Sequence, residues 1–148
     1  MQALQFKINI NASKEKVWNT MLQKPTYEIW TKPFNETSTF EGNWAENSEM
    51  IFLGSDPETA EEGGMISIIK QNIPSEFMSI QHIGEFKNGE REIWENAEIA
   101  FENYTLTEVN SETEVQVDLT SVPDEYVEWM NDLWPKALES LKNLAESN

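Results

Sequence analysis

Apolar and polar residues alternate with period two over most of this chain, and helical spacing replaces the alternation near both ends. Residues 4–10 alternate strictly, which predicts a half-buried strand. Ser13 then offers a helix N-cap. Pro25 ends this first helix and opens a second one over Thr26–Thr31, which Pro33 stops. The first helix presents four apolar residues at helical spacing, Val17, Trp18, Met21 and Leu22.

From about residue 36 to residue 121 the period is two, and turn residues divide the alternation into segments. Gly42-Asn43, Gly63-Gly64 and Asn88-Gly89 are three of these turn signals. The segments predict about six strands in a meander. The last four are expected at Met65–Ile73, Glu76–Phe86, Ala97–Val109 and Thr113–Ser121.

A long helix is predicted to begin at Pro123 and Asp124. Pro135 removes one backbone donor inside it, which predicts a kink near residues 131–134. An apolar stripe follows the helix at helical spacing and would face the sheet. The stripe consists of Tyr126, Met130, Leu133, Ala137, Leu141 and Leu144.

These elements predict an α+β fold in which residues 1–148 form one domain. We expect a curved antiparallel sheet of about seven strands, two short helices after the first strand, and a long C-terminal helix across the sheet. A strongly curved sheet wrapped on one helix tends to leave space between the two.

The chain has 27 acidic and 10 basic residues and a net charge of −17, which limits the kinds of partner it can bind. Nucleic acids and anionic membranes carry phosphates that need Lys and Arg, so we expect neither as a partner. A cationic or neutral partner stays open, although solubility alone would explain the charge. The start of the chain lacks the features of a signal peptide, and no apolar segment is long enough to cross a bilayer. A cytoplasmic protein is therefore expected.

The single histidine, His82, lies in the stretch SIQHIGEF on a predicted strand. Side chains alternate between the two faces of a strand, so one row should face inward and the other outward. His82 is the polar member of the inward row, which is otherwise apolar. The inward row is Met78, Ile80, His82, Gly84 and Phe86, and the outward row is Ser79, Gln81 and Glu85.

A carboxylate is predicted to face inward beside this histidine. Glu102, Tyr104 and Leu106 share one face of their strand, and Leu106 is expected to point to the core. A hairpin through Asn88–Trp94 would set His82 directly opposite Glu102. An inward carboxylate is unfavourable unless it is paired, so the His82–Glu102 pair is consistent with this register.

Several segments, taken in order, resemble one known family along nearly the whole chain. They are INASKEKVWNTML (residues 10–22), Glu41–Trp44, Gly64–Ile69, PSEFMSIQHIGEFKNGE (residues 74–90), AFENYTL (residues 100–106), and Trp134–Leu138 with Leu141 and Lys142. Through them the chain is similar to the START-like superfamily with its helix-grip fold, and most similar to bacterial members that resemble the activator of Hsp90 ATPase.

The resemblance implies a deep, mostly apolar cavity between the sheet and the terminal helix. The superfamily includes lipid and hormone binders, polyketide cyclases and chaperone-activating domains, so the scaffold leaves the function open. In this fold, Trp30, Phe34, Phe52 and Trp94 are expected near the mouth of the cavity. Met130 and Trp134, one turn apart, would form its roof. Filling of the cavity by these bulky side chains is an alternative to ligand binding.

The polar residues of this cavity allow three interpretations. They could satisfy one another as buried polar groups, contact a ligand, or transfer protons. There is no Gly-x-Ser-x-Gly motif, and one histidine without cysteine excludes zinc sites built on His and Cys. We assign no catalytic residue, metal or cofactor.

Our first hypothesis is a binding protein for a small apolar or amphipathic molecule. The alternatives are a cyclase or isomerase that uses the same cavity, and an interaction protein with a chaperone as partner. A monomer or a weak dimer is expected. The predicted ligand-binding residues are Trp30, Phe34, Phe52, His82, Trp94, Glu102, Tyr104, Met130 and Trp134.

Overall fold

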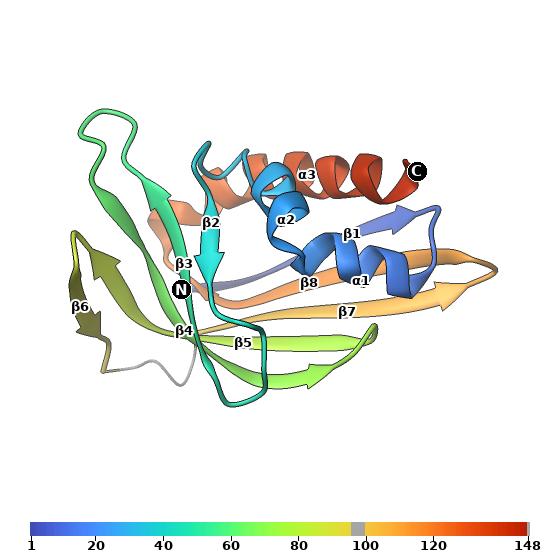
Figure 1. The fold of residues 1–148 in the computed structure, drawn as a ribbon, viewed down its shortest axis with the longest axis horizontal. Coiled ribbons are helices and arrows are strands. Elements are labelled where there is room, and N and C mark those ends of the chain that lie inside the picture. Colours follow the sequence, from blue (N-terminus) through green and yellow to red (C-terminus); the bar gives the residue numbers. More distant parts are fainter. Residues whose placement is uncertain (96–99, 148) are drawn as a thin grey trace.

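The computed structural model describes residues 1–95 and 100–147. Its elements follow the predicted order of one strand, two short helices, a run of strands and a long helix (Figure 1). They are β1 (Gln2–Ile10), α1 (Lys14–Leu22), α2 (Lys24–Trp30), β2 (Thr39–Glu41), β3 (Glu49–Ser55), β4 (Glu62–Ile73), β5 (Phe77–Lys87), β6 (Glu90–Ile93), β7 (Phe101–Val109), β8 (Glu112–Val122) and α3 (Asp124–Glu146).

The strands form one antiparallel sheet in the order β1-β8-β7-β5-β4-β3-β2, with β6 paired to β5. The long helix α3 lies along one face of this sheet and packs on β1, α1 and α2 (Figure 1). The predicted α+β class, with a curved sheet and a long C-terminal helix on it, is confirmed. The described residues contain eight strands, because Glu90–Ile93 forms a strand of its own.

The additional strand β6 follows from a tight turn at Asn88-Gly89. Both residues have positive φ, 50° and 83°, as a two-residue hairpin turn requires. The turn joins β5 directly to β6, so Lys87 pairs with Glu90. The next long strand is described from Phe101, and the predicted beginning of that strand at residues 97–99 lies outside the described residues.

The predicted helix boundaries are largely confirmed. The Ser13 hydroxyl accepts a hydrogen bond from the Lys16 amide at 3.2 Å and caps α1. In α3 the buried face is Trp134, Ala137, Leu138, Leu141 and Ala145. The predicted stripe was therefore wrong at its first member, since Tyr126 is 51% exposed.

The core lies between the concave face of the sheet and the helices α1 and α3. On β8, Val115, Val117 and Leu119 are buried in strict alternation, as the sequence predicts. Val17 and Met21 of α1 and Leu138 and Leu141 of α3 belong to the same apolar cluster. Packing within this cluster holds α3 against one end of the sheet.

A β-bulge interrupts the alternation on β5. On β4, Ile66 pairs with Gly84 and the next residue, Ser67, pairs with His82, so Ile83 is an extra residue on β5. An extra residue reverses which side chains face inward beyond it. The predicted row was therefore wrong after the bulge: Glu85 lines the same pocket as His82, and Phe86 does not.

The sheet also depends on a close backbone approach between β3 and β4. A Cβ atom on Gly64 would lie 1.7 Å from the Phe52 carbonyl oxygen, whereas one on the neighbouring Gly63 would come no closer than 3.4 Å to any other atom. A side chain at Gly64 would therefore force β3 and β4 apart, whereas one at Gly63 would not.

We predict that Gly64→Ala lowers the free energy of unfolding by about 3 kcal/mol or more, because the two strands must separate. Gly63→Ala, one residue away on the same strand, is the matched control and should change it by less than about 1 kcal/mol. Urea denaturation followed by circular dichroism measures both values. Equal effects of the two substitutions would contradict the close approach.

Candidate functional site

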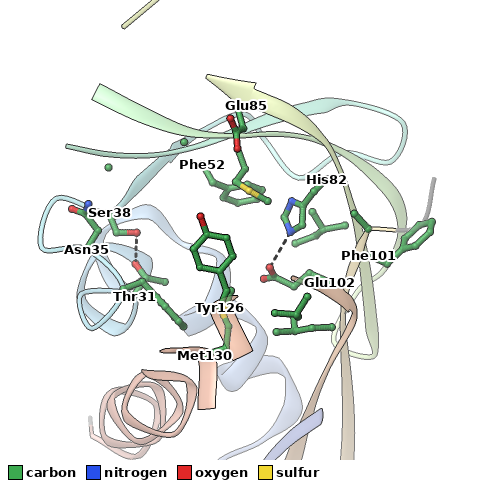
Figure 2. Close-up of a pocket in the computed structure, with 18 of the residues that line it drawn as sticks. Thr31, Asn35, Ser38, Phe52, His82, Glu85, Phe101, Glu102, Tyr126 and Met130 are labelled. Carbon is green, nitrogen blue, oxygen red and sulfur yellow. Dashed lines mark hydrogen bonds and ion pairs between the residues drawn. The ribbon is translucent and has the colours of Figure 1, made fainter. Parts of the chain in front are cut away.

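A pocket of about 1070 Å³ lies between the sheet and the helices α2 and α3. Its wall combines aromatic rings with a small group of polar side chains (Figure 2). The nine residues predicted to bind a ligand all belong to this wall. They come from α2 and the segment after it (Trp30, Phe34), β3 (Phe52), β5 (His82), the segment after β6 (Trp94), β7 (Glu102, Tyr104) and α3 (Met130, Trp134).

Four polar side chains form a continuous hydrogen-bonded network, three of them in this wall and the fully buried Ser67 behind it. The His82 ring lies between Ser67 and Glu102, with Nδ1 2.7 Å from the Ser67 hydroxyl and Nε2 3.1 Å from Glu102 Oε1. The Tyr104 hydroxyl donates to the other oxygen of Glu102. The ring and the carboxylate face each other across the pocket wall in Figure 2.

The donors in this network can be assigned from Glu102. An ionised carboxylate only accepts hydrogen bonds, so the Tyr104 hydroxyl and His82 Nε2 are both donors. In the neutral ring Nδ1 is then an acceptor, and the Ser67 hydroxyl donates to it. Every polar atom of the histidine ring therefore has a partner.

The strand register brings His82 and Glu102 together diagonally. Glu102 pairs with Ile80, and the His82 amide donates to the Ala100 carbonyl at 2.8 Å. The predicted register, with His82 directly opposite Glu102, was therefore wrong by two residues. The hairpin turn joins β5 to β6 and so does not determine how β5 pairs with β7. Diagonal neighbours on one face stay within reach of long side chains, which preserves the contact.

Burial and negative charge act on two phenols of the pocket. Desolvation raises the pKa of Tyr104 well above its usual value, and the charge of Glu102 and the hydrogen bond to it act in the same direction. Desolvation also raises the pKa of Tyr27, again with a contribution from Glu102. Both phenols therefore stay protonated at neutral pH and serve as donors, not as bases.

Aromatic rings form the apolar part of the wall. The indole nitrogens of Trp30 and Trp44 donate to the Met21 and Leu22 carbonyls at 3.1 and 3.0 Å, which fixes both rings. The Trp134 ring packs between other rings, and its centroid lies 4.9 Å from that of Phe34 and 5.9 Å from that of Phe6. Its indole N–H is buried and has no hydrogen-bond partner among the described residues.

Several exposed apolar residues lie at the mouth of the pocket. Met1, Ile93, Tyr126 and Trp129 line it, with exposed fractions of 72, 55, 51 and 44%. Figure 2 shows Tyr126 pointing into the pocket from the start of α3. Exposed apolar residues gathered at one opening are typical of sites where an apolar molecule or surface is bound.

The sequence analysis missed three residues of the pocket wall, Tyr27, Glu85 and Tyr126, and the fully buried Ser67 beside it. Ser67 follows the buried Ile66 without alternation, so nothing in the pattern marked it as inward. Glu85 was assigned to the outward row because the bulge has no sequence signal. Tyr27 and Tyr126 were recognised only as apolar residues of helices, although their spacing from Trp30 and Met130 was a usable signal.

The described residues offer no group of three or more His, Cys, Asp or Glu side chains able to hold a metal ion. In the same part of the chain no helix is both long and apolar enough to traverse a bilayer.

Comparisons with known proteins identify the fold. No family model and no curated protein sequence matches the chain. Among solved structures, a Chromobacterium violaceum protein, CV1439, superposes with a TM-score of 0.73 at 15% identity over 100% of both chains. The Aha1 dimer from Colwellia psychrerythraea gives 0.73 at 20% identity, covering 99% of this chain and 97% of that one.

A third structure is DynU16, a protein of the dynemicin biosynthetic locus. It gives a TM-score of 0.71 at 12% identity, and the match covers 99% of this chain but 48% of DynU16. Identities at this level show the fold alone. They confirm the predicted α+β fold, with a curved antiparallel sheet and a long C-terminal helix on it.

The raised pKa of Tyr104 predicts a loss of stability at alkaline pH. At pH 11 the unfolded chain has released this proton, since a free phenol titrates near pH 10, while the folded chain retains it. The unfolded state then binds fewer protons, so the free energy of unfolding falls as pH rises. The contribution of this one phenol is about 1.4 kcal/mol between pH 8 and pH 11.

Urea denaturation at both pH values checks this prediction, with Tyr104→Phe as the comparison. The variant lacks the phenol, so its loss of stability between pH 8 and pH 11 should be smaller by about 1.4 kcal/mol. The lost hydrogen bond to Glu102 lowers its stability at both pH values and largely cancels in the difference. Identical losses in the two proteins would contradict a buried, protonated Tyr104.

Proposed function

We propose that this protein binds one small apolar or amphipathic molecule in the pocket between the sheet and α3. The observation that carries the proposal is the size of the pocket together with its wall of aromatic rings and one polar network. The pocket opens to solvent, so water fills it when no ligand is bound, and an apolar ligand would displace that water from the aromatic wall.

The polar network supports an amphipathic ligand over a purely apolar one. His82 and Glu102 have side-chain exposures of 14 and 21%, and both belong to the pocket wall. Each carboxylate oxygen of Glu102 accepts one hydrogen bond from the protein and can accept another. A ligand with one polar group in an apolar body would satisfy these atoms.

The second candidate is an enzyme that transfers protons in the same pocket. The observation that favours it is the hydrogen-bonded chain from Ser67 through His82 to Glu102. The Glu102 carboxylate, at the end of this chain in the pocket wall, could accept a proton from a bound substrate. Under this alternative His82→Ala would abolish turnover while the ligand still binds. Under the binding proposal it would weaken binding and no bound molecule would be chemically changed.

A third candidate is interaction with a chaperone. It is supported by the fold shared with the Aha1 dimer from Colwellia psychrerythraea and by a surface of net charge −17. Such a partner would be recognised by the surface and would not require the pocket. A substitution that fills the pocket would therefore leave the interaction intact.

Titration with N-phenyl-1-naphthylamine, a neutral apolar fluorophore, tests the binding proposal. We expect saturable binding of one probe molecule per chain. In a separate measurement, the native mass spectrum of the purified protein should show a bound small molecule that is absent from the denaturing spectrum. Met130→Trp adds volume to the pocket wall and should weaken probe binding at least tenfold. Glu139→Trp, on an exposed position of the same helix, is the matched control and should bind as the unmodified protein does.

Equal affinities in the unmodified protein and in Met130→Trp would show that the probe binds elsewhere and would contradict the proposal. Circular dichroism spectra and melting temperatures of both variants establish that α3 remains folded. A variant that loses probe binding and retains a chaperone interaction would separate the first candidate from the third.

A further inference from the structure

The charged side chains in the pocket wall are all of one sign. Glu102 lies inside the pocket, and Glu85, Glu92 and Glu95 lie toward its mouth, whereas the described wall contains no Lys or Arg. Residues 96–99, which the structure does not describe, add no Lys or Arg in sequence. A ligand in this pocket therefore meets four carboxylates and a single basic side chain, His82, which is already paired with Glu102.

The basic groups nearest to this region are engaged elsewhere. Arg91 on β6 donates to Glu49 at 3.0 Å, and Lys87 on β5 interacts electrostatically with Asp56. The α-amino group of Met1, at the mouth, pairs with Asp124 at 3.1 Å. None of these cations balances the carboxylates of the wall.

Two of the carboxylates are placed against each other. Glu85 of β5 pairs with Glu92 of β6 in the antiparallel ladder, and both belong to the pocket wall. Like charges directly opposite each other on neighbouring strands repel and destabilise the pair. A positive group at the pocket would relieve this repulsion, and a negative group would increase it.

The deeper carboxylate is the more selective one. Glu102 is only 21% exposed, and hydrogen bonds from His82 and Tyr104 hold both of its oxygens in place. Placing a second anion beside it would remove two like charges from water with no counter-ion, which is strongly unfavourable. Aromatic faces around it, including Phe52 and Trp134, are attractive to cations and not to anions.

We propose that the ligand of this pocket carries a positive charge, as a protonated amine or a quaternary ammonium group on an apolar body. The positive group would lie within reach of Glu102, and the apolar body would pack on the aromatic wall. This inference rests on the proposed function, because it names the class of molecule that the pocket binds. It also predicts that fatty acids and other apolar anions are rejected.

Three ligands with the same alkyl chain test the inference on the unmodified protein. Decyltrimethylammonium, decanol and decanoate are titrated below their micelle concentrations by displacement of N-phenyl-1-naphthylamine, at low and at physiological salt. We expect the ammonium compound to bind at least tenfold more tightly than decanol, and decanoate to bind at least tenfold more weakly than decanol. The preference should persist at physiological salt, because a partly buried charge is screened less than an exposed one.

A matched pair of variants locates the charge that is recognised. Glu102→Gln removes the inner carboxylate, and its amide can still join the network because the Tyr104 hydroxyl and the His82 ring can each accept or donate. It should reduce the ammonium-to-decanol affinity ratio at least fivefold. Glu139→Gln, an exposed position outside the pocket wall, removes the same charge and should leave the ratio unchanged.

The outcomes separate the inference from the function on which it rests. If decanol binds and the ammonium compound binds no better, the charge inference is overturned and the binding function stands. If the ratio falls equally in Glu102→Gln and Glu139→Gln, the preference comes from the overall charge of the chain and the inference is also overturned. If neither N-phenyl-1-naphthylamine nor any of the three ligands binds, the proposed function and the inference both fail. The ligand comparison on the unmodified protein remains decisive even if Glu102→Gln does not fold.

Discussion

The pocket depends on a single strand that changes partners halfway along its length. β5 pairs with β7 through Phe77–Gln81 and with β6 through Gly84–Lys87, and its bulge at Ile83 lies between these two stretches. One strand cannot hydrogen-bond two different neighbours on the same edge over the same residues. The sheet therefore divides beyond the bulge, and residues of the segments on either side of the division, Trp94 and Ala100, line the pocket.

The bulge also determines which polar side chains lie at the pocket. It places Ser67 beside His82 across the β4–β5 ladder and turns Glu85 toward the pocket. Without the extra residue the alternation would place Glu85 on the outer face. Bulges are known to re-aim side chains near functional sites, and here one bulge positions both a neutral donor for the histidine and a carboxylate.

The inner carboxylate then constrains the surrounding groups. Glu102 sits in a wall that is otherwise largely apolar, so it requires donors, and His82 and Tyr104 supply them. The same charge contributes to the raised pKa of Tyr104 and Tyr27, so that the phenols remain protonated donors. A network of this kind stabilises the pocket and gives it a negative electrostatic character. The fold is shared with proteins at 12–20% identity, so the fold does not by itself identify a ligand or a reaction.

The amino-acid sequence by itself determined the local structure and, together with the family resemblance, indicated nine of the residues that line the pocket. Period-two alternation, the Ser13 cap, the Asn88-Gly89 turn and the terminal apolar stripe are short-range signals, and the strands and helices follow them. The relation between strands was decided only in the tertiary structure. The Ile80–Glu102 register arises from pairing between β5 and β7, which no turn connects directly, and the bulge at Ile83 lies inside the β4–β5 pairing, far from the turn that joins those strands. Residue alternation cannot encode such a pairing, because one extra residue reverses the faces without changing the pattern of the sequence.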